Sequence, residues 1–370
     1  MRFPLALLVL FPVLSVGRFS EHVIANDLKG GYQVVAADLN GDGKMDVIAL
    51  ASGQPDLVWY ENPTWQRHAI AANMHAMINL AYWDGQIALA SNFSMEAKKS
   101  IGSVAILTPN GDPRALWNSK IIDHLTTSHR LRWADIYGNG HKVLINAPLT
   151  GVHAEPPEYR DHVPLVFYRP GEWKQEVISH ANEGIQHGLF ITDWGGGGRD
   201  AILTGSFSGI DLFQLEADGN WTRTEIARGD PDPCPKCGTS DIAVGRLGHE
   251  KFLATIEPWH GNELAVYRRE RGQWKRTVIY NSLVQGHTIV AADLDGDGRD
   301  EIIAGYRGNG GSVLIYKADP RGSWSKTILD SKIPANACAV ADLNGDARPD
   351  LVCIGGSLLK WYENTKEWLH

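Results

Sequence analysis

Four of the fourteen histidines in this 370-residue chain recur at one place in a repeated pattern. Upstream of seven successive turns stand Tyr32, His75, His129, His187, Ser240, His287 and Asn336. Imidazole binds Zn, Cu, Fe and Ni, and it also serves as a general acid or base. We therefore select His75, His129, His187 and His287 as candidate catalytic residues, and as candidate ligands of zinc or another divalent transition metal.

Three further residues flank this set. Tyr32 belongs to the same aligned position, and His153 and His260 lie in long loops expected on the same side of the molecule. Loops on a rigid scaffold often carry binding residues, although such loops are also often ordinary solvated surface. Imidazolium groups held close together would repel each other, so the pKa values should fall and favour neutral ligands or bases.

Acidic residues form a second pattern, at spacings suited to a hard cation. The sets are Asp38, Asn40, Asp42 and Asp46; Asp293, Asp295, Asp297 and Glu301; and Asp342, Asn344, Asp346 and Asp350. Alternating oxygen ligands around a glycine turn can enclose Ca²⁺. In the third set Ala347 replaces the glycine, which makes the turn more costly. The alternative is that Asp and Asn only close a tight turn through hydrogen bonds to the backbone.

Both patterns belong to a repeat that occurs seven times. An aromatic residue followed five positions later by Ile or Leu begins each copy, at Phe19, Trp65, Trp117, Trp173, Trp221, Trp274 and Trp324. Three apolar runs with the character of strands follow each copy, separated by turns. Four strands over about 45 residues are the size of one propeller blade.

The predicted fold is all-β, a seven-bladed β-propeller of four-stranded blades. The last unit, from Asn336 to Asn364, contains three clear strands, whereas the outer strand at 19–24 has no unit before it. We expect the N-terminal strand to complete the last blade and close the ring, because closure hides the open sheet edges. An open solenoid of seven units is the alternative. In a closed ring the inner strands line the axis, so the selected histidines should meet at one channel mouth.

The sequence Asp-Leu-Asn-Gly-Asp-Gly-x-x-Asp before an apolar strand resembles the FG-GAP/VCBS repeat of integrin-type propellers. It is sharp at Asp38, Asp293 and Asp342 and degenerate in the other four units. The resemblance implies structural calcium in these loops. The repeat type is also similar to that of the propeller part of aldos-2-ulose dehydratases, and we transfer no catalytic residue from that likeness.

The first 17 residues have the features of a secretory signal peptide, which leaves 18–370 for the propeller. An uncleaved anchor is the alternative. We expect a secreted or periplasmic protein, a monomer, with no membrane contact after cleavage. The net charge is −8 and Lys and Arg are scattered singly, so nucleic acid is not an expected partner.

The four cysteines fall into two pairs. Cys234 and Cys237 lie in a loop sequence and favour a local disulfide, although such a pair is also a weak zinc signal. Cys338 and Cys353 lie on neighbouring predicted strands, where they either form a disulfide or serve as small core residues.

Three functions fit these features. The first is a metal-assisted lyase or dehydratase acting on a sugar or polysaccharide, because removing a proton beside a carbonyl needs a base, an acid and a positive centre. The second is a non-catalytic propeller that binds carbohydrate or protein. The third is a secreted metal-binding protein without turnover. The sequence leaves open whether the protein is an enzyme.

Overall fold

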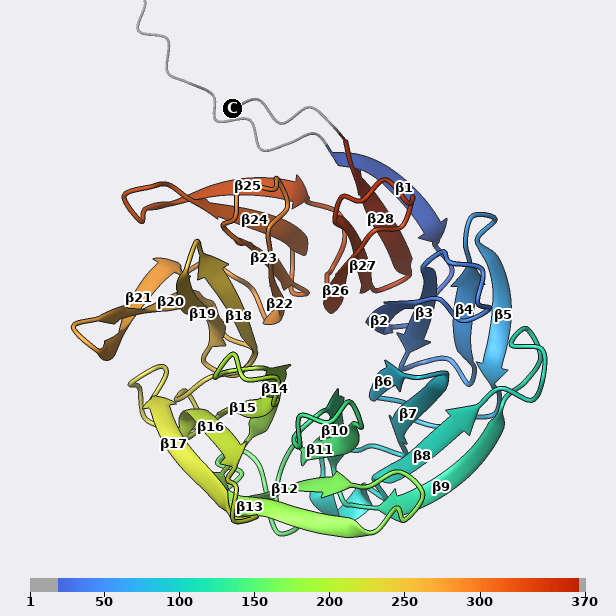
Figure 1. Ribbon diagram of the computed structural model, residues 1–370, viewed down its shortest axis with the longest axis horizontal. Helices are drawn as coiled ribbons and strands as arrows, with labels where there is room; N and C mark the ends of the chain where they lie inside the picture. The colour runs from blue at the N-terminus through green and yellow to red at the C-terminus, as the bar shows by residue number, and fades with distance from the viewer. Residues whose placement is uncertain (1–18, 366–370) are drawn as a thin grey trace, which may run out of the picture.

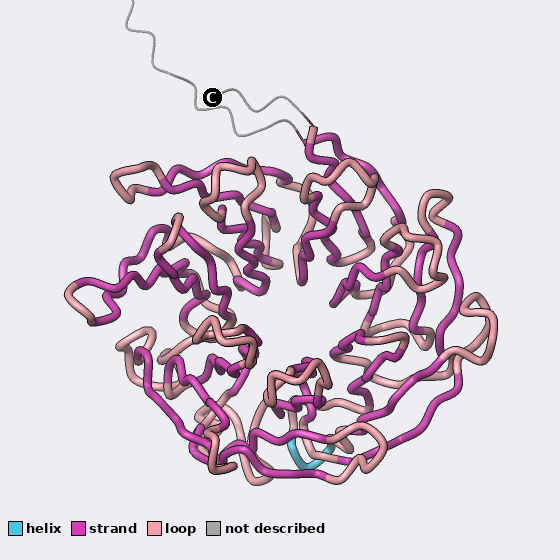
Figure 2. Tube along the Cα trace, in the orientation of Figure 1, coloured by secondary structure: helices cyan, strands magenta, loops and turns pink. Residues whose placement is uncertain are grey.

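The computed structural model describes residues 19–365 and arranges them as seven four-stranded antiparallel sheets around a common axis (Figure 1). The all-β, seven-bladed prediction is therefore confirmed. The predicted signal peptide at 1–17 lies outside the described residues. Figure 2 shows strands and loops almost throughout, and the helix assigned in the described range is one short turn, η1 (Ala97–Lys99).

Each blade runs from an inner strand at the axis to an outer strand at the rim. The inner strands are β2 (Gly31–Ala37), β6 (Asn79–Trp83), β10 (Ser128–Ala134), β14 (Gln186–Thr192), β18 (Ile242–Leu247), β22 (Gly286–Ala292) and β26 (Ala337–Ala341). The second strands are β3 (Asp46–Ala51), β7 (Gln86–Ser91), β11 (Val143–Pro148), β15 (Ala201–Ser206), β19 (Glu250–Glu257), β23 (Glu301–Tyr306) and β27 (Asp350–Gly355).

The remaining two strands of each blade lie farther from the axis. The third strands are β4 (Leu57–Glu61), β8 (Ser103–Thr108), β12 (His162–Tyr168), β16 (Gly209–Leu215), β20 (Glu263–Glu270), β24 (Ser312–Ala318) and β28 (Leu358–Asn364). The outer strands are β5 (Gln66–Ala71), β9 (Asn118–His124), β13 (Gln175–Glu183), β17 (Trp221–Ala227), β21 (Gln273–Tyr280), β25 (Trp324–Asp330) and β1 (Phe19–Ala25).

The N-terminal strand closes the ring. β1 pairs antiparallel with β28, from Phe19 opposite Asn364 to Ala25 opposite Leu359, and it completes the sheet β1-β28-β27-β26. Figure 1 shows β1 along the outer side of β28, at the junction between the two ends of the chain. The predicted closure is confirmed, and the open solenoid is wrong.

The hydrophobic core lies between neighbouring blades. All six residues of β3 are buried, because the sheets beside it cover both of its faces. Ile48 and Trp59 of the first blade belong to the same buried cluster as Leu80 and Leu89 of the second. Outer strands such as β1 alternate between exposed and partly buried residues, since only one face meets the core.

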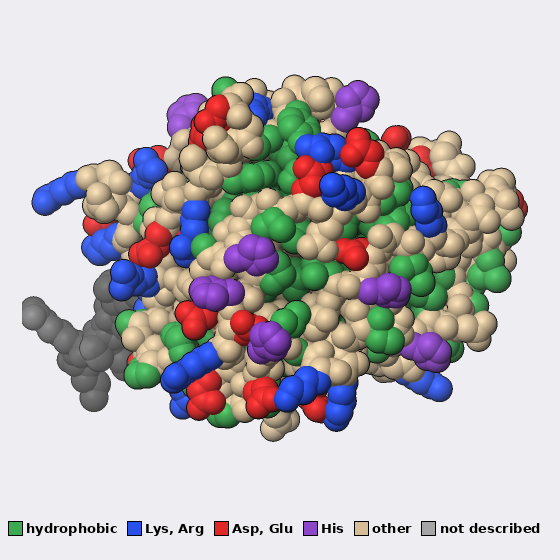
Figure 3. Space-filling model, turned by 90° about the horizontal axis from the view of Figure 1, so that it is seen from below, with side chains coloured by type: hydrophobic (Ala, Val, Ile, Leu, Met, Phe, Trp, Pro, Cys, Tyr) green, Lys and Arg blue, Asp and Glu red, His purple; other side chains and the backbone are tan. Residues whose placement is uncertain are grey.

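Both cysteine pairs form disulfides. Cys338 of β26 lies opposite Cys353 of β27 and bonds to it, which ties the two strands of the last hairpin. Cys234 bonds to Cys237 within the loop that precedes β18, as the local reading of that sequence predicts. Among residues 19–365 no helix has the length and apolar character needed to cross a bilayer. On the side drawn in Figure 3, acidic and basic side chains are interspersed.

Candidate functional site

Four inner strands carry a β-bulge at their second residue. In β2 the pairing with β3 skips Tyr32. The same irregularity in β10, β14 and β22 leaves His129, His187 and His287 without a partner in the ladder. A bulge releases one residue from the regular pairing and redirects its side chain. Equivalent bulges in four blades therefore present four side chains at the same level of the channel.

The rings at these bulges meet. Ring centroids lie 5.0 Å apart for His129 and His187, 5.3 Å for His187 and His287, and 5.2 Å for Tyr32 and His287. The Tyr32 hydroxyl oxygen lies 3.4 Å from Nε2 of His129. His260, on the loop after β19, adds a fourth imidazole, whose centroid lies 4.8 Å from that of His187. We call His129, His187, His260 and His287 the histidine cluster.

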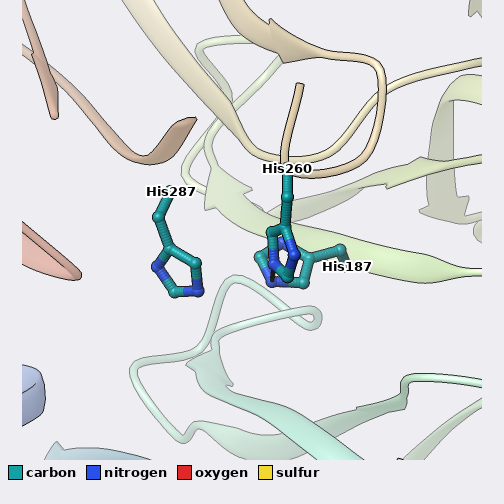
Figure 4. Close-up of side chains that lie close together, drawn as sticks. All are labelled: His187, His260 and His287. Carbon is teal, nitrogen blue, oxygen red and sulfur yellow. Dashed lines mark hydrogen bonds between the residues drawn. The ribbon is translucent and has the colours of Figure 1, made fainter. Parts of the chain in front are cut away.

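Three members of the cluster are close enough to share one ion. One ring nitrogen from each of His187, His260 and His287 lies within 4.8 Å of the others. Figure 4 shows His260 overlapping His187 in projection, with His287 facing the pair. The two Nε2 atoms of His187 and His260 are 3.2 Å apart. The candidate transition-metal site therefore consists of His187, His260 and His287.

His75 does not join the cluster. It is exposed in the loop before β6, and its carbonyl accepts a hydrogen bond from the Asn92 N–H. In blade three the equivalent hydrogen bond is accepted by the carbonyl of Thr127, which lies two positions before the bulge residue His129. Asn79 begins the regular pairing of β6, directly after Ile78. Blade two thus has one extra residue here, so Ile78 takes the bulge position, and the alignment that selected His75 is wrong.

His153 also stays outside the cluster. It lies exposed in the loop between β11 and β12, where its backbone N–H donates to the Asp161 carboxylate at 2.7 Å. That loop is on the expected side of the molecule, since it joins the second and third strands of its blade. His153 is therefore part of an ordinary solvated loop, which is the alternative given for such loops in the sequence analysis.

Hydrogen bonds fix the protonation of two cluster members. Arg307 Nη2 lies 3.2 Å from Nδ1 of His260 and must donate to it, because a guanidinium has no acceptor. Neutral His260 then carries its proton on Nε2 and donates it to Nε2 of His187. His187 in turn donates from Nδ1 to the Ser240 hydroxyl at 3.2 Å. Nε2 of His187 also lies 3.3 Å from Nη2 of Arg130, which can only donate, so two donors face this nitrogen.

Burial keeps the imidazoles neutral. Burial, followed by the charge of Arg307, lowers the pKa of His260 to about 3. Burial also lowers the pKa values of His129, His187 and His287 well below their ordinary value. A neutral imidazole keeps one lone pair for a metal ion or a proton. The expectation of depressed pKa values agrees with this environment.

One lone pair in the cluster has no partner. His287 donates from Nδ1 to the Asn336 carbonyl at 2.6 Å, which leaves Nε2 as the acceptor. His287 is 1% exposed, and its Nε2 has no hydrogen-bond partner within residues 19–365. Nδ1 of His129 is likewise buried without a partner. Buried polar groups are nearly always hydrogen-bonded, so both nitrogens are candidate contacts for a bound group.

Charged residues around the cluster escaped the sequence analysis. Arg130 donates from Nε to the His187 carbonyl at 3.0 Å, and its Nη2 lies 3.8 Å from the Asp241 carboxylate. Arg132 follows two positions later on β10 and lines the same cavity as Arg130. Neither arginine recurs at equivalent places in other blades, so no repeated signal marks them. Their adjacency to a selected histidine was the available clue.

Comparisons with known protein families identify the type of repeat. Residues 30–62 match the FG-GAP repeat and residues 293–353 match the FG-GAP-like repeat. The chain is a β-propeller with FG-GAP repeats. Residues 101–270 of this FG-GAP propeller match the β-propeller domain of aldos-2-ulose dehydratase.

Individual proteins extend the likeness. Aldos-2-ulose dehydratase of Phanerodontia chrysosporium is 25% identical over 301 residues, which cover 71% of the FG-GAP propeller and 33% of that protein. Integrin alpha pat-2 of Caenorhabditis briggsae is 28% identical over 131 residues, 32% of this chain and 11% of that one. The match thus spans about a third of the first relative and about a tenth of the second. Sqt1 of Saccharomyces cerevisiae has a TM-score of 0.59 at 10% identity, over 90% of this chain and 84% of its own, which shows shared fold alone.

The FG-GAP loops join the first and second strands of a blade, and their first Asp closes the turn. Asp38 accepts hydrogen bonds from the backbone N–H groups of Gly41, Asp42 and Gly43. The equivalent carboxylates do the same in four further loops, at Asp135, Asp193, Asp293 and Asp342. Blades three and four lack the other acidic positions, so this Asp serves the turn by itself.

The three acidic loops differ in what faces their carboxylates. In blade six the Lys317 ammonium contacts Asp295, lies 3.0 Å from Asp297 and lies 3.5 Å from Glu301. Burial raises the pKa of Glu301 to about 8. Lys317 therefore supplies positive charge where a cation would be expected.

The loop of blade seven has the backbone cost expected from its sequence. Ala347 has a φ of 64°, in the region that favours glycine. Arg348 contacts Asp346. The carboxylates of Asp293, Asp295 and Asp297 in blade six lie within 4.8 Å of one another. In blade one, by contrast, no Lys or Arg among residues 19–365 forms an ion pair with Asp38, Asp42 or Asp46, so a cation there would meet no competing positive charge.

Proposed function

We propose that the histidine cluster holds a divalent transition metal, zinc being the best fit, and that the protein removes water from a sugar bound beside it. Two observations carry the proposal: Nε2 of His287 is a buried acceptor without a partner, and one ring nitrogen of His287 lies within 4.8 Å of ring nitrogens of His187 and His260. An acceptor in that position calls for a metal ion or a ligand proton.

The donor set suits zinc. Three imidazoles with one bound substrate atom give the coordination number of catalytic zinc sites, where Zn–N distances are about 2.0–2.1 Å. The 3.2 Å separation of Nε2 atoms in His187 and His260 is compatible with two ligands of one such ion, provided that Nε2 of His260 gives up its proton. When bound, zinc would act as a Lewis acid that draws electrons from a carbonyl oxygen of the sugar.

His129 and Tyr32 supply the proton chemistry in this proposal. Neutral His129 takes the proton from the carbon next to the sugar carbonyl. Burial raises the pKa of the Tyr32 phenol, which stays protonated and gives its proton to the departing hydroxyl, so the C–O bond breaks and water leaves. Tyr32 then recovers a proton from His129 across their 3.4 Å contact. The net change is loss of one water from the sugar.

The sugar class rests on similarity. The name of aldos-2-ulose dehydratase states both a keto-sugar and the loss of water, and its propeller domain matches 101–270 here. The alternative is a non-catalytic propeller that binds carbohydrate or protein, favoured by the 28% identity to an integrin α chain. A metal-binding protein without turnover is the third candidate. Sugar binding without product would select the second candidate, and metal without sugar binding the third.

The test uses matched histidine variants. We expect about one zinc per purified chain of the parent, measured by elemental analysis, and loss of one water from an aldos-2-ulose, followed by mass spectrometry. His187→Ala and His287→Ala should each lower zinc affinity by at least about 10- to 100-fold and abolish turnover. His75→Ala and His153→Ala are the controls and should match the parent. Full zinc content and turnover in His287→Ala would refute the proposal.

Three further proposals complete the description. Calcium binds the blade-one loop through Asp38, Asn40, Asp42 and Asp46, with the loops of blades six and seven weaker. The protein is exported, to the periplasm or outside the cell, which agrees with two disulfides among its four cysteines. It works as a monomer, because β1 completes the last blade and the strand edges that remain free are those of the short outer strands at the rim.

A further inference from the structure

A cavity of about 290 Å³ lies in the channel next to the histidine cluster. His287 lines it together with Arg130, Arg132 and Asp241. The remaining lining comes largely from apolar residues of the inner strands, such as Leu189 and Ile289. A group bound at Nε2 of His287 would therefore have a charged chamber beside it.

The charges of this chamber do not balance. Arg130 and Arg132 both line it, because alternate residues of β10 face the same side. Arg307 lies outside this lining and contacts His260 of the histidine cluster. Asp241 is the one acidic residue among the described residues that line the cavity. Buried charge without a counter-ion costs free energy, so two arginines in the lining against one carboxylate favour an anion from outside.

Arg132 has donors to offer to such an anion. Its hydrogen bonds within residues 19–365 are made by Nη1, to the Asn79 side chain at 3.3 Å and the Leu131 carbonyl at 2.8 Å. Nε and Nη2 have no protein acceptor in that range, and these two nitrogens form the edge of the guanidinium that binds a carboxylate with two parallel hydrogen bonds. Arg130, by comparison, already uses Nε to hold the His187 carbonyl.

We propose that the chamber binds the anionic end of the substrate, so that the sugar handled at the histidine cluster is an acidic one, a uronic acid or a related sugar carboxylate. This inference rests on the proposed sugar function and specifies its substrate class. The sugar ring lies at the histidines, and the carboxylate pairs with Arg132 and Arg130. A sugar phosphate shares the same chemistry, and the test separates the two.

Binding is measured by calorimetry on the full chain, with zinc present, at low salt. D-glucuronate should bind at least about tenfold more tightly than D-glucose, as expected for one charge-assisted pair of hydrogen bonds. D-glucose 6-phosphate binding more tightly than D-glucuronate would assign the chamber to phosphate instead and overturn the carboxylate. Equal affinity for D-glucuronate and D-glucose in the parent protein would overturn the inference without any variant.

Two arginine variants locate the effect. Arg132→Gln should reduce the preference for D-glucuronate to about twofold or less, since a neutral side chain removes the charge assistance. Arg246→Gln, an exposed arginine near the other end of inner strand β18, is the matched control and should keep the full preference. An unchanged preference in Arg132→Gln would overturn the inference. Arg132→Lys keeps the charge and should give an intermediate value.

The outcome is separable from that of the proposed function. D-glucuronate binding needs no turnover, whereas the proposed function is tested by zinc content and loss of water from an aldos-2-ulose. Dehydration of a neutral aldos-2-ulose with no preference for D-glucuronate would leave the proposed function standing and overturn the acidic substrate. Preferential D-glucuronate binding without zinc or turnover would support the acidic ligand and overturn the proposed function.

Discussion

Nε2 of His260 lies 3.2 Å from Nε2 of His187, and Arg307 holds the opposite nitrogen of His260 from the other side. Two lone pairs would repel each other at that separation, so the proton between the rings belongs to His260. A metal ion bound at the same two atoms has to replace this proton and lie near a guanidinium. The charge of Arg307 therefore disfavours a metal ion at these two atoms.

The first prediction follows from that opposition. Arg307→Met removes both the positive charge and the donor at Nδ1 of His260, so zinc affinity should rise by about tenfold, or 1.4 kcal/mol. A competition titration with a zinc chelator measures the change. Arg246→Met removes a distant exposed charge and should leave the affinity as it is. Weaker zinc binding in Arg307→Met would show that the arginine supports the site.

The second prediction concerns the FG-GAP loop of blade six. Lys317→Met removes the ammonium group that contacts Asp295 and lies near Asp297 and Glu301. Without calcium the variant should melt below the parent, because the carboxylates lose their counter-charge. With calcium it should recover and gain more than the parent does. Thermal melts with calcium and with chelator test this, and equal calcium responses in both proteins would contradict it.

Blade one provides a contrasting test. Asp42→Ala should remove part of the calcium-dependent rise in melting temperature of the parent, since Asp42 belongs to the acidic loop without a competing cation. The same substitution should matter little in the presence of chelator, because Asp42 is exposed. A parent protein whose melting temperature ignores calcium would rule out the blade-one site.

The third prediction concerns the acid stability of the contact between blade six and the closing blade. Asp330 at the end of β25 is 5% exposed and accepts hydrogen bonds from Lys360 and from the Tyr362 hydroxyl, both at 2.7 Å. Burial opposes the charge of Asp330, but these two hydrogen bonds outweigh it and hold its pKa below the ordinary value. Its stabilising contribution is therefore present above the unfolded-state pKa and disappears as pH falls through the lower folded-state value.

Asp330→Asn should expose this contribution. At pH 7 the variant should lose about 2 kcal/mol, because the buried Lys360 ammonium loses one of its two carboxylate partners and keeps only Glu21. The difference from the parent should shrink as pH drops below about 4. Urea unfolding between pH 3 and pH 7 is the measurement. A difference that stays constant over this range would mean that the ion pair is not responsible.

The fourth prediction concerns ring closure. A protein lacking residues 18–26 loses β1, which leaves β28 as an exposed edge and removes the Glu21 contact to Lys360 at 2.8 Å. It should melt at a much lower temperature and aggregate. Val23→Ser, at an exposed position of the same strand, keeps the pairing and is the control. A truncated protein that melts like the parent would disprove the role of β1.

The fold could be predicted because its signals recur seven times. Each aromatic and its following Ile or Leu mark an outer strand, and an unmatched strand at 19–24 pairs with an incomplete unit beginning at Asn336. A misaligned residue within one repeat leaves the number of repeats, and so the number of blades, unchanged. The sequence leaves the pairing of Cys338 and Cys353 open, because two cysteines on neighbouring strands can either bond or serve as small core residues, whereas the structure has them opposite each other and bonded.

The site was predicted only in part, and the reason lies in its irregular positions. Three of four aligned histidines converge because their strands share a bulge, but one added residue in blade two puts Ile78 where His75 was expected. His260 was proposed from its loop alone, and it takes part in the cluster. Arg130 and Arg132 carry no repeat, so their role depends on contacts that no pattern in the chain reports.

The bulge at the second residue of an inner strand has a consequence for how such a protein can change over evolutionary time. Its side chain takes no part in strand pairing, so replacing it leaves the hydrogen-bonded ladder of its blade intact. Each blade then contributes one replaceable side chain to the mouth of the channel. Tyr32, Ile78 and His129 are the side chains at this position in the first three blades. New reactions can arise by changing one blade at a time, without refolding the ring.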